Sequence, residues 1–422
     1  MRSGLDLKKI CLVGALAAVV AVGSLQVFNE EKAKSNKDNT QQFRTRQADG
    51  PSVTAARGNS SSAAEVPQKA FKLPKSVEYF ADDMSEEQKR AFASVYDGIC
   101  NFEETIPIDG TVIDRDSADD FVSAILAQSP DVDQIGSSYS ISFDTEGTVN
   151  SITLDYIMTK EEYDSRQAEL DEKCSEILAG MNEGWSDYRK VMYLHDTIAD
   201  ICYYSDEGTD PYSAYGCLVD GRAVCQGYSK AMQTLCLRAG IDCICVSGYA
   251  SDPYGAQSHI WNKIRIDDVW ANFDVTWDDP LTSTGLPYLR YDYFGLTDDE
   301  IAYDHTPDEN EYITYPEADS TELNYYTKSG LFYDGAASAE DVMRFSVISS
   351  MSTGDNTARM KCADAELYNQ AVAELFGDYS GQGAKIYGIL ADAVAQTGSG
   401  WSSSEFAYIK NDGLYTITVF FR

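Results

Sequence analysis

The segment "GRAVCQGYSK", residues 221–230, places a cysteine where a helix is predicted to begin. After Cys225, apolar side chains recur every three to four positions, as on the buried face of a helix. Gly240 ends this pattern, since glycine readily adopts the left-handed conformation that follows many helices. The members of the stripe are Tyr228, Ala231, Met232, Leu235, Cys236 and Ala239. We therefore expect Cys225 at the N-terminus of a packed helix.

The position of Cys225 suits a reactive thiol. Unsatisfied backbone N–H groups at a helix N-terminus carry about half a positive charge, which stabilises a thiolate. Such sites lower the pKa of a cysteine from its ordinary value of about 8.5. Gly221 and Gly227 leave little side-chain bulk near the sulfur. The alternative is a small buried residue at the start of a helix, and this segment alone leaves both interpretations open.

Residues 258–280, "SHIWNKIRIDDVWANFDVTWDDP", are predicted to form two antiparallel strands joined by a two-residue turn at 267–268. In that register His259 and Asp274 are diagonal neighbours on one face, with Cα atoms roughly 7–8 Å apart and side chains within reach. A four-residue loop would set them directly opposite each other. A one-residue slip would place them on opposite faces, so the pairing is a firm structural expectation.

Together, Cys225, His259 and Asp274 form a candidate catalytic set. An imidazole beside a thiol removes its proton, and a carboxylate on the other ring nitrogen fixes the tautomer and stabilises the imidazolium. Taken alone, His259 could be a structural histidine and Asp274 a solvated carboxylate at a strand end. Their combination with Cys225 favours nucleophilic catalysis.

The remaining histidines are predicted to be structural. His195 lies in an amphipathic helix pattern and is expected to pack against or cap that helix, whereas His305 is expected in a loop that seals the edge of the core. Asp278 and Asp279 could bind Ca²⁺, but a turn that ends the strand is the favoured interpretation. With 3 histidines and no CxxC pair, a zinc site has few ligands to draw on, and we expect neither a metal nor a cofactor.

Two longer stretches, "YGCLVDGRAVCQGYSKAMQTLCLRAGIDCICVSG" and "HIWNKIRIDDVWANFDVTWDDP", carry a family resemblance over roughly residues 185–310. They resemble the core of the transglutaminase-like superfamily, whose bacterial members are papain-like in fold. The family's cysteine, histidine and aspartate fall on Cys225, His259 and Asp274. The resemblance implies acyl transfer with a stabilised oxyanion. The backbone N–H of Cys225 is one natural donor, and Tyr215 is a candidate for the second.

The charge of the chain limits the classes of molecule that we expect it to bind. Of 33 basic and 68 acidic residues, residues 1–75 hold 12 and 6, which leaves 21 and 62 in the remainder. So acidic a surface repels phosphate backbones, and we expect no nucleic-acid partner. The surface could favour cationic ligands or Ca²⁺, although a heavily solvated surface is the simpler interpretation.

The N-terminal residues predict export. Basic residues precede an uncharged apolar run over residues 10–28, which nearly spans a bilayer core of roughly 30 Å. Residues 21–23, "AVG", would make an acceptable cleavage site, so a signal peptide and an uncleaved anchor both stay open. Either way the bulk of the chain is expected to be extracellular, secreted or attached to the cell surface, and to meet the membrane only through this segment. Nine cysteines follow Cys11, so at least one thiol is free if the others pair within the chain.

The fold class predicted is α/β (α+β), with a papain-like transglutaminase core between two accessory domains. In chain order the units are a signal peptide or anchor (1–28), a disordered linker (29–75), an N-terminal α+β domain (76–184), the core (185–310) and a C-terminal α/β domain (311–422).

The resulting prediction is a cysteine enzyme that acts on amide or peptide bonds through a Cys225 thioester. Hydrolysis of a protein or peptide, such as a cell-wall peptide, is favoured over cross-linking by amine transfer. A surface-displayed binding or scaffold protein that retained the fold is the rival from another class.

Overall fold

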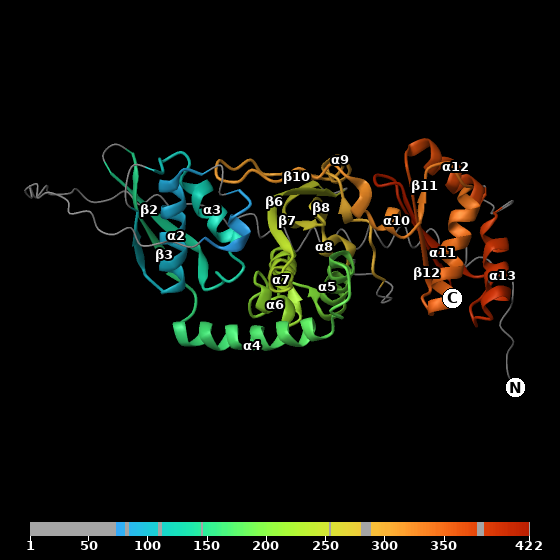
Figure 1. Cartoon of the computed structure of the whole chain (residues 1–422), viewed down its shortest axis with the longest axis horizontal. Helices are drawn as coiled ribbons and strands as arrows, with labels where there is room; N and C mark the ends of the chain where they lie inside the picture. Colours follow the sequence, from blue (N-terminus) through green and yellow to red (C-terminus); the bar gives the residue numbers. More distant parts are fainter. Residues whose placement is uncertain are drawn as a thin grey trace, which may run out of the picture.

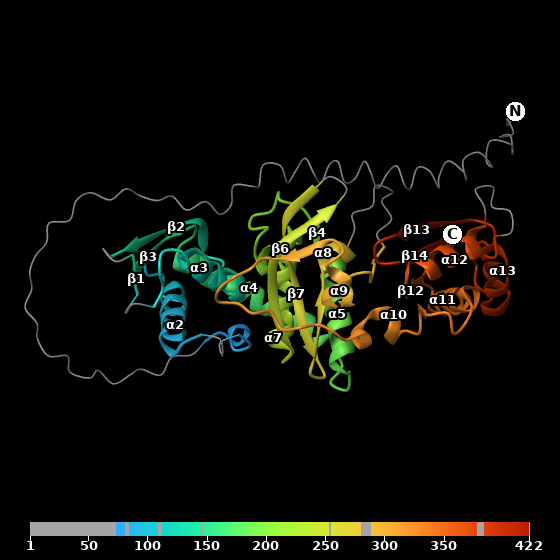
Figure 2. The ribbon, with the colours of Figure 1, turned by 90° about the horizontal axis from the view of Figure 1, so that it is seen from above.

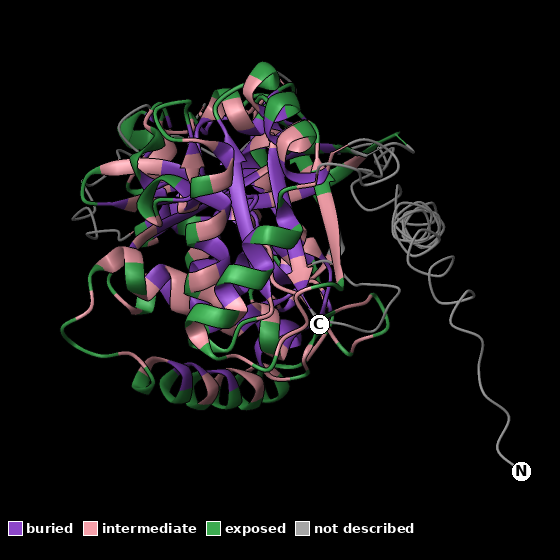
Figure 3. Cartoon of the chain, turned by 90° about the vertical axis from the view of Figure 1, so that its right-hand side faces the viewer, coloured by how far each residue is buried: buried purple, intermediate pink, exposed green. Residues whose placement is uncertain are grey.

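The structure, a computed structural model, describes residues 73–80, 84–108, 112–144, 147–252, 255–279, 288–377 and 384–421. Three packed units lie in a row, each with its own cluster of buried apolar side chains (Figures 1 and 2). Buried residues concentrate on strands and on inward helix faces (Figure 3). The mixed α/β class is as predicted. The apolar run at 10–28 lies outside the described residues. Within those ranges, no helix combines the length and the apolar character needed to cross a bilayer.

The first unit is a three-stranded antiparallel sheet, in the order β1-β3-β2, packed against two helices. The first helix begins after Ser85, which forms a capping box with Gln88 and so satisfies backbone N–H groups that the helix leaves free. The elements are η2 (Lys75–Val77), α2 (Glu86–Cys100), β1 (Thr105–Pro107), α3 (Ala118–Gln128), β2 (Ile135–Phe143) and β3 (Val149–Tyr156).

The central unit carries a five-stranded antiparallel sheet in the order β10-β6-β7-β8-β9. Helix α7 packs on this sheet, and α5, α6 and α8 pack against α7. The first elements are α4 (Lys160–Ala179), α5 (Asp187–Ile201), β4 (Tyr203–Tyr204), α6 (Ala214–Leu218), β5 (Arg222–Ala223) and α7 (Cys225–Arg238). They are followed by β6 (Asp242–Asp252), β7 (Gly255–Ile266), β8 (Val269–Phe273), α8 (Val275–Asp278), β9 (Phe294–Leu296), α9 (Asp298–Ile301) and β10 (His305–Pro307).

The register of the β7–β8 hairpin is the predicted one. Ile266 pairs with Val269 and Asn262 with Phe273, so the turn consists of Asp267 and Asp268. Both turn residues have positive φ, 51° and 65°, as the tight turns that match strand twist require. The second strand is shorter than predicted, because it ends at Phe273 and the chain enters α8.

At two places, the clusters of buried side chains divide the chain differently from the predicted domain boundaries. Leu170, Cys174 and Ile177 of α4 are buried in the cluster of the central unit, although α4 was assigned to the N-terminal domain. Conversely, Tyr312 and Ile313 pack into the cluster of the first unit, although residues from 311 on were assigned to the C-terminal domain. The segment after β10 therefore runs back along the N-terminal unit before the third unit begins (Figure 2).

The third unit is a four-stranded sheet in the order β11-β12-β14-β13, covered by helices. It is joined to the central unit by an ion pair of 2.7 Å between buried Lys361 and Glu300, and by Leu414, which packs beside Trp261 and Tyr293. Its elements and the connection before it are η4 (Thr321–Leu323), α10 (Tyr325–Lys328), β11 (Phe332–Tyr333), α11 (Ala339–Thr353), β12 (Thr357–Cys362), α12 (Ala365–Phe376), α13 (Ile386–Thr397), β13 (Phe406–Asn411) and β14 (Thr416–Phe421).

Candidate active site

Cys225 is the first residue of α7, as predicted. Its neighbour Val224 occupies the N-cap position and provides no side-chain cap, so the first backbone N–H groups of the helix are not covered by one. Gly227 allows a close approach here, because a Cβ at that position would lie 2.6 Å from the carbonyl oxygen of Pro211. All nine cysteines in the described part of the chain are free thiols, and Cys225 and Cys100 are the two that are not buried.

His259 and Asp274 form a buried ion pair. The Nε2 atom of His259, near the middle of β7, lies 2.5 Å from Oδ2 of Asp274. Asp274 follows the last residue of β8 and caps α8, so that its other oxygen, Oδ1, accepts the backbone N–H of Trp277 at 3.1 Å. Strand pairing and helix capping together fix this carboxylate relative to the imidazole.

His259 also interacts with the thiol of Cys225. Burial lowers the pKa of His259, but attraction and a hydrogen bond from Asp274, followed by a hydrogen bond with Cys225, outweigh it and raise the pKa from 6.5 to about 10. Since Nε2 faces Asp274, the second ring nitrogen, Nδ1, is the one available to the thiol. The structure thus brings together the three residues that the sequence singled out.

The two pKa shifts define a pH window. Burial raises the pKa of Asp274, but the charge and hydrogen bond of His259, with those of His305, hold it well below 3.8. Asp274 therefore stabilises the fold above pH 3.8, and this contribution is lost as the pH falls. The raised pKa of His259 has the opposite sign: its contribution is complete below pH 6.5 and is lost as the pH rises through about 10. Between pH 3.8 and pH 6.5 both contributions are complete.

His305 corrects a prediction. It begins strand β10 instead of lying in a loop, and its ring is fully buried. Its Nε2 atom lies 3.1 Å from Oδ2 of Asp274, and its Nδ1 atom lies 2.6 Å from Oδ1 of Asp304. The ring is also in contact with Trp277, at 4.7 Å between centroids. The only signal in the sequence was the scarcity of histidine, because nothing local links residue 305 to Asp274.

The other polar residues considered from the sequence have structural partners. His195 is buried in α5, where its Nε2 atom lies 3.2 Å from Oδ2 of Asp278, so the predicted packing role is confirmed. Asp278 lies in α8 and not in a strand-ending turn, and its Oδ1 atom accepts the backbone N–H of Tyr293 at 3.0 Å. Asp279 accepts the hydroxyl of Tyr228 at 2.8 Å. The contacts of Asp278 and Asp279 hold α8, and therefore also Asp274, in place against the rest of the central unit.

Tyr215 is not supported as the second oxyanion donor. It lies in α6, and its hydroxyl donates at 2.8 Å to Glu169 of α4, a residue outside the cysteine–histidine–aspartate set. The hydroxyl therefore already has a carboxylate partner, and its contact joins two helices of the central unit.

One group of side chains in the described part of the chain has the composition of a metal site. His259, Asp274 and His305 offer ligand atoms within 4.8 Å of one another. The Nε2 atoms of both histidines face the same carboxylate oxygen, however, and this hydrogen-bonded arrangement needs no ion to hold it together.

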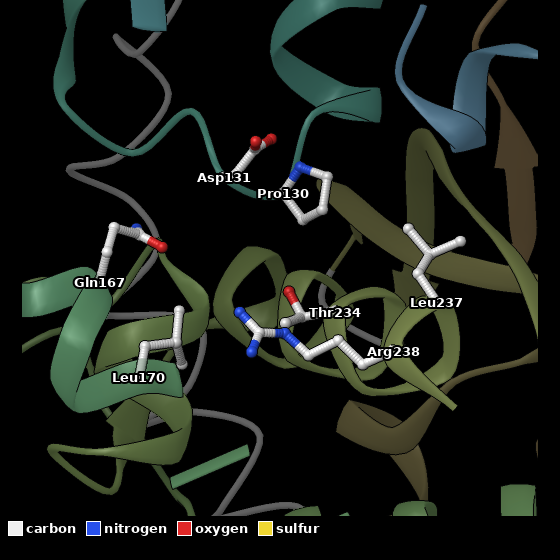
Figure 4. A pocket seen from close by; sticks show the side chains of 7 residues that line it. All are labelled: Pro130, Asp131, Gln167, Leu170, Thr234, Leu237 and Arg238. Atoms are coloured by element: carbon white, nitrogen blue, oxygen red, sulfur yellow. The ribbon is translucent and has the colours of Figure 1, made fainter. Parts of the chain in front are cut away.

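A cleft of about 130 Å³ lies elsewhere, where the N-terminal unit meets α4 and α7 (Figure 4). Arg238, at the end of α7, projects into it and pairs with Asp171 of α4 at 2.5 Å. The lining residues are Pro130, Asp131, Gln167, Leu170, Thr234, Leu237 and Arg238. None of the three candidate catalytic residues lines this cleft, so it belongs to the junction between units.

Comparisons with known proteins match the part of the chain that contains these residues. Residues 176–275, which contain all three, match the family described as the Transglutaminase-like superfamily. A stretch of 191 residues is 26% identical to the Kyphoscoliosis peptidase of Homo sapiens, covering 40% of this chain but only 28% of that protein. Among solved structures, a TGase aligns over 37% of this chain and 47% of its own at 16% identity, with a TM-score of 0.25. A candidate cysteine protease from Cytophaga hutchinsonii aligns over 36% and 64%, also at 16% identity, with a TM-score of 0.24.

Proposed function

We propose that this chain, whose residues 176–275 match the Transglutaminase-like superfamily, is a cysteine enzyme that cleaves amide bonds in a protein or peptide. The observation that carries the proposal is the contact series from Cys225 through His259 to Asp274 at the start of a helix. Cys225 is the nucleophile, His259 the general base and acid, and Asp274 the carboxylate that orients the imidazole. The N-terminal apolar segment supports action outside the cell, with the enzyme secreted or attached to the surface.

The chemistry follows from the charges of the three groups. The thiolate of Cys225 adds to the amide carbonyl carbon, and the negative charge that develops on oxygen faces the N-terminus of α7. The imidazolium of His259 gives its proton to the leaving nitrogen as the C–N bond breaks, which leaves a thioester. Water then adds to the thioester while His259 takes its proton, the C–S bond breaks, and the acid and free thiolate are released.

Water is the proposed acyl acceptor in preference to an amine. The curated relative is named a peptidase, which supports hydrolysis. Which molecule accepts the acyl group depends on whether water or an amine substrate reaches the thioester. The choice between hydrolysis and amine transfer is therefore tested separately from the role of Cys225.

Incubation with denatured proteins should release new amino termini or ammonia. We expect Cys225→Ala to lower this release by at least about 10⁴-fold, because the nucleophile of a coupled set is lost. Cys100→Ala is the matched control, since Cys100 is the other thiol that is not buried, and it should retain the activity. Incorporation of a fluorescent primary amine into a glutamine peptide, with no free acid formed, would overturn hydrolysis. Unchanged binding of partner proteins by Cys225→Ala, without turnover by the natural chain, would instead indicate a scaffold protein.

The pH dependence of thiol alkylation tests the ion pair without a substrate. Because His259 holds its proton up to about pH 10, we expect Cys225 to react with iodoacetamide at pH 6 much faster than Cys100, whose pKa burial raises to about 11. In His259→Ala the rate at pH 6 should fall by about 10- to 100-fold, because the thiolate loses the positive charge beside it. Peptide mapping by mass spectrometry resolves the two thiols. Equal rates for both at pH 6 in the natural chain would contradict an ion-paired thiolate.

A further inference from the structure

We propose that His305, held by Asp304, is a positioning residue that fixes the Asp274 carboxylate against His259. The inference rests on the proposed function and adds two residues to it. Both lie outside the segment that matches the family, residues 176–275. Neither is expected to touch the substrate, because His305 contacts the carboxylate of Asp274 and Asp304 contacts His305.

The first support is a continuous series of side-chain contacts behind the catalytic set. Oδ2 of Asp274 lies 2.5 Å from His259 and 3.1 Å from His305. On its other side, the ring of His305 meets Oδ1 of Asp304 at 2.6 Å. The second oxygen of Asp304 accepts the hydroxyl of Tyr293 at 2.5 Å. Every group in the series is buried, so each contact is made away from water, where it is stronger than at the surface.

The second support is the way in which the backbone fixes His305. Strand β10 lies at the edge of the sheet beside β6, where His305 pairs with Ala250. The approach is close because β6 carries Gly248, where a Cβ would lie 2.2 Å from the carbonyl oxygen of Thr306. The backbone N–H of Ser251 also donates to the carbonyl of Asp304 at 2.7 Å. Strand pairing therefore fixes His305 on the same sheet that carries His259.

The third support is the need that His305 meets. A fully buried carboxylate favours its uncharged form unless donors surround it, and an uncharged Asp274 would not stabilise the imidazolium of His259. The backbone N–H of Trp277 occupies Oδ1 of Asp274, and His305 occupies Oδ2 beside His259. His305 thus completes the donors that keep Asp274 charged and prevent the carboxylate from turning away. The titratable groups that face His305 are Asp274, Asp304, His259 and Tyr293.

The test compares His305→Leu, His305→Gln and Asp304→Asn in the full chain by iodoacetamide alkylation of Cys225 at pH 6 and pH 10. Cys100 in the same sample reports on the integrity of the fold, and thermal unfolding is measured beside it. We expect His305→Leu to lower the Cys225 rate at pH 6 by about tenfold, the effect of one hydrogen bond to a charged group. At pH 10, where a cysteine is largely thiolate without assistance, the rate should stay within about twofold.

The conservative variants sharpen the expectation. The side-chain amide of His305→Gln can still donate to Asp274, so the rate at pH 6 should recover to within about threefold of the natural chain. Asp304→Asn should show the same pH-selective loss as His305→Leu but a smaller one, because Asp304 acts through the ring. Asp304→Asn keeps the proposal testable if His305→Leu does not fold.

The outcomes separate this inference from the proposed function. If the natural chain alkylates quickly at pH 6 and both His305→Leu and Asp304→Asn do so equally quickly, the positioning role is wrong and the proposed function stands. Equal losses at both pH values, with a lower unfolding temperature and a faster Cys100, would show a structural role only and would also overturn the inference. A natural chain in which Cys225 is no more reactive than Cys100 would overturn both.

Discussion

Replacing Asp274 with alanine should lower the alkylation rate of Cys225 at pH 6 by about 100-fold, because the imidazolium that stabilises the thiolate is lost, and should abolish amide cleavage. The physical reason is the burial of His259, which has 7% of its side chain exposed. Burial alone lowers the pKa of this imidazole, and the charge of Asp274 is the main influence that raises it to about 10. Without the carboxylate, the ring is neutral at pH 7 and no longer holds a thiolate beside it.

Two further variants show whether charge or hydrogen bonding is responsible. Asp274→Asn keeps an amide oxygen that can accept from His259 but removes the charge, so its rate at pH 6 should lie between those of the natural chain and Asp274→Ala. Asp267→Asn is the matched control, because Asp267 lies in the turn of the same hairpin with φ of 51°, a conformation that asparagine also adopts. It should leave the profile unchanged. An Asp274→Ala protein that reacts as quickly as the natural chain at pH 6 would remove Asp274 from the mechanism.

Replacing Asp133 with asparagine should lower the free energy of unfolding by about 3–5 kcal/mol at pH 8, the typical result of leaving a buried charge without its partner. Asp133, which precedes β2, binds Lys230 of α7 at 2.7 Å, and their side chains are 6% and 4% exposed. The ammonium of Lys230 would remain buried in the helix that begins with Cys225 without its hydrogen-bonded carboxylate, with the weaker attraction of Asp210 still acting on it. Four of the five tryptophans lie between residues 185 and 277, so fluorescence in guanidinium reports on this unit.

Controls distinguish a buried pair from a general effect of charge removal. In the double variant Asp133→Asn/Lys230→Met most of the loss should be recovered, since both charges are gone. Glu86→Ala breaks an exposed pair with Lys89 and should cost less than about 1 kcal/mol. Burial raises the pKa of Asp133 to about 6 despite the opposing charge of Lys230. Because this pKa lies above the ordinary 3.8, the natural chain gains stability as the pH falls through about 6, and the cost of Asp133→Asn should therefore be larger at pH 5 than at pH 8. A cost equal to that of Glu86→Ala would contradict this account.

The features predicted correctly are those that neighbouring residues set. The helix beginning at Cys225 follows from apolar spacing and from Gly240, whose φ of 79° ends it as expected. The β7–β8 register follows from a turn at 267–268, since a hairpin fixes every later pairing. The proximity of His259 to Asp274 is a consequence of that register and needed no further information. The domain boundaries stay a prediction. Helix α4, which was assigned to the N-terminal domain, buries its apolar side chains in the cluster of the central unit.

The amino-acid sequence by itself therefore determined the local geometry of the candidate site: where the thiol begins its helix and which carboxylate faces the imidazole. Only the tertiary structure decided which distant residues contact the candidate site and the helix that carries Cys225. His305 reaches Asp274 across 31 residues, and Lys230 reaches Asp133 across 97. Such contacts depend on how β10 pairs with β6 and how the N-terminal unit docks on α7. No periodicity or turn encodes them, because they form only when separate elements bury their apolar faces against one another.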